Sequence, residues 1–275
     1  MKTLFIIIFI IALILIYGYV ENFRFIVTKY HIRNKKVPKQ LDGKKCILIS
    51  DLHNSCFGTS NQRLIDRIKE INPDFILIAG DSVNGIKNCD TAIAFLKTIS
   101  KEYKCFAADG NHELQLKLYL KDEYEIYNKT GIINLENDFK DYGDFCRVYG
   151  LNIDISYYKR MHQPQFSANY LTRCLGICDD KYYNILVAHN PQYIDYYAKA
   201  GYNFIVCGHF HGGFVRLPFI GGLITPQLKL FPKYSGGHYT VEGQDVVVSR
   251  GLGSHTLRFR IFNTPELIVC DFETL

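Results

Sequence analysis

Five short motifs that carry His, Asp or Asn each come directly after a run of apolar residues. Such short apolar runs are typical of strands buried on both faces of a sheet. In an open α/β sheet, residues just beyond the carboxyl ends of the strands lie in one crevice. The pattern therefore predicts an α/β fold in which the five motifs converge on one site. They are Asp51-Leu52-His53, Gly80-Asp81, Gly110-Asn111-His112-Glu113, His189 and Gly208-His209-Phe210-His211-Gly212-Gly213.

The fifth motif has the spacing of a metal site. Residues i and i+2 of an extended segment project to the same side, so His209 and His211 can reach one ion. The flanking glycines leave room for the ion and its other ligands. Each motif taken alone also has a purely structural explanation. Asp51 could cap a helix or turn, Gly80-Asp81 and Gly110-Asn111 could form turns, and His189 could lie in a loop. Their joint occurrence at five strand ends favours the metal site.

The order DxH, GD, GNHE, H, GHxH resembles that of the calcineurin-like metallophosphoesterase superfamily, over Asp51 to His211. The tail, with Arg216-Leu217-Pro218 and Ser249-Arg250-Gly251-Leu252-Gly253, resembles the membrane-associated bacterial phosphodiesterase-like branch. The resemblance implies a four-layer αββα sandwich of two mixed β-sheets. It also implies a two-metal centre for displacement at phosphorus, with attack by a hydroxide held between the metals.

The resemblance further assigns ligands to the two metals. Asp81 would bridge them, and His112 would contact the substrate and protonate the leaving oxygen. Where many relatives carry an aspartate that orients this histidine, the chain has Asn84, which leaves the acid role of His112 open. The donor set suits Mn, Fe or Zn better than Ca, with Mn favoured. The ligand set is Asp51, His53, Asp81 and His211 for the first metal, and Asp81, Asn111, His189 and His209 for the second.

Further candidates are weaker. Arg216 and Arg250 could bind phosphate, but a surface role explains an arginine equally well. Cys174 and Cys178 could form half of a metal site, although no second pair follows and the nine scattered cysteines indicate free thiols in a reducing compartment. Residues 114–182 receive no assigned role.

The N-terminal residues 4–20 are apolar or aromatic apart from Gly18 and carry no charge, so as a helix they just span a bilayer. We expect a transmembrane anchor at 1–22, a basic juxtamembrane linker at 23–45 and a metallophosphoesterase domain at 46–275. The basic segment places the domain on the cytoplasmic side by the positive-inside rule, and can bind anionic lipid. The alternative is a cleaved signal and export, but no small-residue cleavage site follows.

The net charge of +5 lies almost wholly in the N-terminal part. Residues 21–45 carry eight basic and two acidic side chains and Lys2 adds one charge, so residues 46–275 have a net charge of −2. This balance argues against a nucleic-acid partner. No protein partner is predicted.

The expected elements alternate between strand and helix up to residue 207, and short β-hairpins follow and form a second sheet. Helices are expected at 60–72, 91–103, 114–127 and 192–200. Strands are expected at 46–50, 75–79, 105–108, 145–151, 185–188, 204–207, 215–217, 238–241, 246–249, 256–261 and 267–272.

The leading function is hydrolysis of a phosphodiester or pyrophosphate, with a lipid-linked substrate made plausible by the anchor. Alternatives are a phosphomonoesterase, a secreted or cell-wall phosphodiesterase, and a non-catalytic scaffold that keeps the metals.

Overall fold

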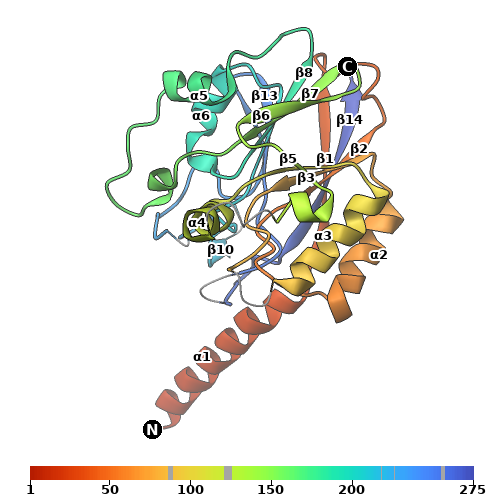
Figure 1. Ribbon diagram of the computed structural model, residues 1–275. Helices are drawn as coiled ribbons and strands as arrows, with labels where there is room; N and C mark the ends of the chain where they lie inside the picture. The colour runs from red at the N-terminus through yellow and green to blue at the C-terminus, as the bar shows by residue number, and fades with distance from the viewer. Residues whose placement is uncertain (86–88, 121–125, 218, 226, 255–257) are drawn as a thin grey trace.

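Two six-stranded sheets pack face to face in the computed structural model, and helices cover both outer faces (Figure 1). The structure describes residues 1–85, 89–120, 126–217, 219–225, 227–254 and 258–275. Three hydrophobic clusters define the layers. One lies between α2, α3 and the first sheet, one between the two sheets, and one between the second sheet and α5, α6. The predicted four-layer αββα sandwich is confirmed.

The first sheet has the strand order β1-β14-β2-β3-β4-β5. Strands β2 to β5 run parallel, β14 is antiparallel to β2, and β1 is parallel to β14. The bounds are β1 Ile26–Asn34, β2 Lys45–Ile49, β3 Phe75–Ala79, β4 Cys105–Ala108, β5 Ile133–Asn134 and β14 Glu266–Thr274.

The second sheet has the order β12-β13-β9-β8-β7-β6, with β7, β8, β9 and β13 parallel. In the described part of the tail, β12 and β13 join it, β14 returns to the first sheet, and β10 pairs with β11 in a small sheet of two strands. The bounds are β6 Asp138–Tyr142, β7 Cys146–Leu151, β8 Tyr183–Ala188, β9 Phe204–Cys207, β10 Arg216–Leu217, β11 Gly221–Gly222, β12 Gly237–Val241 and β13 Gln244–Val248.

The helices of the body pack their apolar stripes on the sheets. In α2, Leu64, Ile65 and Ile68 are buried at the predicted spacing, and the helix ends before Pro73. Helix α4 starts at Asn111, earlier than predicted, and residues 121–125 of that prediction lie outside the described residues. Helix α5 was not predicted. The α-helices are α2 Gln62–Ile71, α3 Asp90–Glu102, α4 Asn111–Leu120, α5 Ala168–Leu175 and α6 Ile194–Lys199; short 3₁₀ turns occupy Glu21–Phe23, Thr59–Asn61, Asn128–Thr130, Ile155–Tyr158 and Pro191–Tyr193.

Helix α1, Lys2–Val20, projects from the body as a single exposed rod (Figure 1). It is long and apolar enough to cross a membrane. Only its Gly18 is buried, and that residue packs on Phe259 near the other end of the chain.

Residues 23–45 are not a linker, in contrast to the sequence-based expectation. Strand β1 pairs with β14 along its whole length. The lysines and arginines obscured this strand, but they alternate with inward residues, so that Ile32 is buried between the exposed His31 and Arg33. Val37 and Leu41 are also buried. The domain therefore starts about twenty residues earlier than predicted.

The strand expected at 256–261 does not form in its described part. Residues 256 and 257 lie outside the described residues, residues 258–260 are not a strand, and Ile261 makes an isolated bridge to Val215. Arg260, in this stretch of alternating apolar and basic residues, is buried and donates its hydrogen bonds to backbone carbonyls and Ser254.

Candidate metal centre

The five motifs lie together at the carboxyl ends of five parallel strands. Asp51 and His53 follow β2, Asp81 follows β3, and Asn111 and His112 follow β4 in the first sheet. From the second sheet, His189 follows β8, and His209 and His211 follow β9. Backbone hydrogen bonds join these segments, with the Asp51 amide donating to the Gly80 carbonyl and the Gly208 amide to the His189 carbonyl.

One group of potential ligands is formed by Asp51, His53 and His211. Their ligand atoms lie within 4.8 Å of one another, and all three side chains are buried. The Nε2 atoms of His53 and His211 are 3.2 Å apart, and His211 Nε2 is 3.4 Å from Asp51 Oδ1. Imidazole nitrogens and a carboxylate oxygen that point at one small volume are the arrangement a divalent transition metal requires.

A second group is formed by Asp81, His189 and His209, again within 4.8 Å. His189 Nε2 lies 3.1 Å from Asp81 Oδ2 and 3.2 Å from His209 Nδ1. Asp81 Oδ2 is also 3.7 Å from His53 Nε2 in the first group. Asp81 therefore lies between the two groups, where a bridging ligand belongs.

Asn111 supplies a direct test of whether two ions fit. Its Oδ1 is buried, and among the described residues no hydrogen-bond donor reaches it. A buried carbonyl oxygen without a partner is costly, unless a ligand satisfies it. The partnerless amide oxygen of Asn111 is accordingly a candidate ligand for a second metal.

His112 stands beside the two groups at the edge of the site. Its ring lies edge-on to that of His53 with centroids 4.8 Å apart, and its amide donates to Asp81 Oδ1 at 2.9 Å. The side chain is partly exposed, as is that of Asn111, whereas the other six ligand candidates are buried. Asn84 is exposed, three residues beyond Asp81.

The site residues sit on strained backbone. Positive φ angles occur at Asp51, His53, Asp81, His209 and His211. Non-glycine residues in this region cost of the order of 1–3 kcal/mol each and concentrate at functional sites. The turns that impose these angles direct the side chains inward at the point where each strand ends.

Two glycines allow the backbone to approach the carboxylates. A Cβ atom at Gly110 would lie 2.1 Å from Asp81 Oδ1, and one at Gly208 would lie 2.5 Å from Asp51 Oδ2. Neither carboxylate could keep its place beside a larger residue. This steric demand explains why the motifs read Gly-Asn-His and Gly-His.

Glu113 fixes the turn that carries Asp81. Its buried carboxylate accepts hydrogen bonds from the backbone amides of Asp81, Ser82, Val83 and Gly110, at 2.8 to 3.3 Å. One side chain therefore joins the loops after β3 and β4. Burial and the nearby Asp81 raise the pKa of Glu113 to about 8, although these amide bonds favour its charged form.

Backbone carbonyls determine the tautomers of two histidines. His189 Nδ1 lies 2.6 Å from the Ala79 carbonyl and His211 Nδ1 lies 3.0 Å from the Gly253 carbonyl. A carbonyl oxygen can only accept, so each Nδ1 carries a proton and each Nε2 is the nitrogen left to face the site. Metal-binding histidines are held in this way in proteins generally.

The electrostatics favour a cation in the site. Burial raises the pKa of Asp51 to about 6. Burial opposes charge on Asp81 too, but His189, His112 and His53 together hold the pKa of Asp81 well below its usual value. Burial lowers the pKa of His189, but the carboxylates of Asp81 and Asp51 that face it outweigh this effect and raise the pKa to about 9. Positive charge is stabilised at the position that a metal would take.

Arg216 and Arg250 are both held by structural partners. Arg250 pairs with buried Glu266 at 2.5 Å, and Arg216 donates to the carbonyl of Gly236 at 2.8 Å and to Ser235. These contacts account for both side chains without phosphate. Among the described residues, Cys174 and Cys178 belong to no group of potential metal ligands, and both are free thiols.

Sequence reasoning missed Arg260 and Asn263. The buried Arg260 guanidinium donates to the carbonyls of Gly253 and Arg250, at 2.6 and 2.8 Å. Asn263 Nδ2 donates to the carbonyl of His211 at 2.6 Å. No short motif marks either residue; the one available signal was a basic residue at the centre of an apolar, strand-like run.

The sequence profile of the calcineurin-like phosphoesterase family matches residues 44–213, which include all seven candidate ligands and His112. The chain belongs to this family. Its members hydrolyse phosphoesters, so the chain is a phosphoester hydrolase by family.

Curated relatives match most of the chain. An uncharacterized metallophosphoesterase of Aquifex aeolicus is 28% identical over 95% of this chain and 97% of its own. Phosphodiesterase YaeI of Escherichia coli is 26% identical over 82% of this chain and 81% of its own. A transmembrane protein with a metallophosphoesterase domain from Danio rerio is 24% identical over 88% of this chain and 56% of its own.

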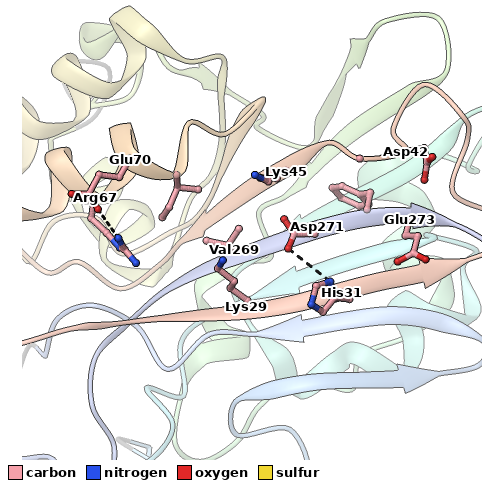
Figure 2. A pocket seen from close by; sticks show the side chains of 12 residues that line it. Lys29, His31, Asp42, Lys45, Arg67, Glu70, Val269, Asp271 and Glu273 are labelled. Carbon is pink, nitrogen blue, oxygen red and sulfur yellow. Dashed lines mark hydrogen bonds and ion pairs between the residues drawn. The ribbon is translucent and has the colours of Figure 1, made fainter.

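A separate hollow of about 590 Å³ lies at the opposite end of the first sheet, between β1, β14 and α2 (Figure 2). Lys29, His31, Lys45 and Arg67 line it together with four acidic residues. His31 faces Asp271 at 3.8 Å, and Arg67 pairs with Glu70 within α2. Because it lies at the other end of the first sheet from the candidate ligands, this hollow is not part of the metal centre.

Proposed function

We propose that the chain is a binuclear, metal-dependent enzyme that hydrolyses a phosphodiester or pyrophosphate bond. The observation that carries the proposal is the position of Asp81 between two groups of buried ligands. The partnerless Oδ1 of Asn111 supports a second ion. The name of the relative YaeI supports a diester rather than a monoester substrate.

The proposed ligands are Asp51, His53, Asp81 and His211 for one ion, and Asp81, Asn111, His189 and His209 for the other, with Mn favoured over Fe or Zn. When bound, two such ions supply Lewis-acid polarisation of the phosphoryl oxygens and a water that ionises near neutral pH. The protein's own part is to hold the ligands before the ions arrive, through the strained turns and the carboxylate of Glu113.

His112 is the proposed proton donor to the leaving oxygen. It is partly exposed, and its ring contacts His53, so it can meet substrate at the mouth of the site. Asn84 stands where many relatives carry an aspartate, so the chain provides no carboxylate at that position to orient the ring of His112.

We further propose that α1 is a single membrane span and that the body lies on the cytoplasmic side. The apolar length of α1 and the cluster of basic residues after it support this orientation. The name of the Danio rerio relative adds support for a membrane protein. A lipid-linked phosphoester is then the substrate that such an anchored enzyme would meet. Fusion of a reporter enzyme to the C-terminus tests the orientation.

The first experiment compares the full chain with Asp81→Ala and a control, Asp138→Ala, at an exposed position of β6. Bound metal is determined by elemental analysis, and hydrolysis of bis-p-nitrophenyl phosphate and p-nitrophenyl phosphate is measured with added Mn²⁺. We expect two metals per chain, preferential diester cleavage, and a loss of at least ~100-fold in Asp81→Ala alone.

Other outcomes separate the alternatives. Preference for the monoester would indicate a phosphatase. Two bound metals without turnover of either compound would favour a selective enzyme or a metal-binding scaffold, and a wild type that binds no metal would overturn the proposal.

A further inference from the structure

Six apolar side chains that no described element covers gather on the loops after the metal centre. All are more than half exposed, and we call them the apolar tip: Phe219, Ile220, Leu228, Leu230, Phe231 and Phe262. An exposed apolar patch on a soluble protein marks a surface that meets a partner. Phe219, Leu228, Phe231 and Phe262 also have positive φ angles, so these large side chains occupy tight turns that glycine or asparagine usually fills.

Backbone hydrogen bonds join the apolar tip to the end of α1. The Gly18 carbonyl accepts from the Arg260 amide at 2.9 Å, and the next residue, Ile261, donates to the Phe214 carbonyl at 3.0 Å. The Phe214 amide donates to the Ile224 carbonyl, and the Phe231 amide to the Leu223 carbonyl. The loops of the tip therefore form one small β-structure seated against the last turn of α1.

Side chains continue this contact. The rings of Tyr17 and Phe262 are 5.9 Å apart, Gly18 packs on Phe259, and Ser254 donates to Asn22 at 3.0 Å. Tyr17 and Tyr19 near the end of an apolar span belong at the membrane–water boundary. Phe262 is consequently at the same level, and the exposed surface of α1 runs directly into the apolar tip.

The charges around the tip suit a membrane surface. Residues 214–234 and 258–264 contain no acidic residue and five basic ones, of which Lys233 and Arg258 are exposed and Arg260 is buried. Lys233 pairs with Asp195 at 2.9 Å. Large apolar side chains flanked by cations are the composition of segments that lie in the interfacial region of bilayers with anionic lipid.

We propose that the apolar tip enters the interfacial region of the bilayer beside α1 and forms a second membrane contact. This contact deepens the proposed function and rests on α1 being the anchor. The tip is directly connected to the candidate metal centre. Phe214 follows His211 by three residues, and Asn263 Nδ2 donates hydrogen bonds to the carbonyls of both His211 and Gly213. Insertion of the tip therefore holds the site at the level of lipid phosphates.

Tryptophan fluorescence tests this placement, since the chain contains no tryptophan. The full chain is reconstituted into phosphatidylcholine–phosphatidylglycerol vesicles, with or without lipids brominated on their acyl chains. Ile220→Trp and Phe231→Trp report on the tip. Ile177→Trp is the control, because Ile177 is an isoleucine still more exposed than Ile220, and it follows α5, which lies far from α1 (Figure 1). Phe9→Trp reports on α1.

We expect brominated lipid to quench about half or more of the emission of both tip variants and of Phe9→Trp, and to leave Ile177→Trp unchanged. Quenching of Phe9→Trp alone would overturn the second contact while leaving the anchor in place. Absence of quenching in all variants would overturn both the second contact and the anchor. Blue-shifted but unquenched emission from the tip variants would overturn the second contact, because it would show that protein rather than lipid covers the tip. Diester hydrolysis measured on the same samples reports on the proposed function independently.

Discussion

The orientation of the His211 ring depends on the backbone carbonyl of Gly253, which also accepts a hydrogen bond from Arg260. The Gly253 carbonyl accepts from His211 Nδ1 and from the Arg260 guanidinium, at 3.0 and 2.6 Å. Arg260 is buried and makes its hydrogen bonds to carbonyls and to Ser254, and burial lowers its pKa to about 10. A buried cation that makes these bonds fixes the loop geometry behind His211, a proposed metal ligand.

Arg260→Lys should therefore weaken metal binding without removing a ligand. A lysine keeps the charge but cannot bond the carbonyls of Arg250 and Gly253 together in the same fork. We expect Mn²⁺ affinity to fall ~10–100-fold, the range for residues that orient metal ligands. Isothermal titration of the metal-free full chain measures it, and Arg258→Lys at the exposed neighbour is the control. Equal affinity of both variants and wild type would show that Arg260 serves packing alone.

At the scale of single residues, the sequence indicated the candidate metal ligands but not the residues that position them. Asp51 and His211 stand out because their motifs, taken together with the other three, match the order of metal-binding motifs in the family. Glu113 was visible in its motif but had no assigned role, since its partners are backbone amides, which leave no trace in a sequence. Arg260 could be recognised only once the fold had buried it.

Helix α1 is joined to the body through one face of its last turns. Gly18 is its buried residue, and a Cβ atom there would lie 2.5 Å from the ring of Phe259. The neighbouring Arg260 amide bonds the Gly18 carbonyl. Helix α1 is thus in contact with the segment that holds the loops of the candidate metal centre.

Gly18→Leu should lower stability and activity, because Gly18 contacts the segment that holds the loops of the candidate metal centre. The added side chain would displace Phe259, and overpacking of this kind costs about 1–3 kcal/mol. We expect a lower temperature of thermal unfolding in detergent and a severalfold loss of diester hydrolysis. Ala12→Leu adds similar bulk to an exposed face of the same helix and should change neither. A Gly18→Leu protein with wild-type stability and activity would show that the contact is not maintained in the membrane.

Elements with a strong local signal were predicted well, and elements defined by distant pairing were not. Strands Phe75–Ala79, Cys105–Ala108 and Phe204–Cys207 have the predicted bounds, because buried strands of a parallel sheet are continuously apolar. The place of β14 could not be predicted, since its pairing with β1 spans the whole chain. Strand β1 itself was hidden by the charges on its exposed side.

The first and last strands of the chain form one edge of the molecule, and this edge decides where the domain begins. Strand β1 covers β14, and Ile32, Val37 and Leu41 from the same segment are buried in the core between the sheets. Burial of each side chain contributes about 1.5–3 kcal/mol. Their sum is of the order of the stability of a whole domain, about 5–15 kcal/mol.

A protein that starts at residue 46 should therefore fold poorly, whereas one that starts at residue 23 should not. The shorter protein loses three core side chains and leaves β14 as an unprotected edge that can pair with another chain. We expect residues 46–275 to aggregate or to unfold at a markedly lower temperature than residues 23–275, as measured by soluble yield and thermal unfolding. Both lack α1, so the comparison isolates the contribution of residues 23–45. Equal yield and stability of the two proteins would mean that residues 23–45 contribute nothing to the stability of the domain, as expected of a linker.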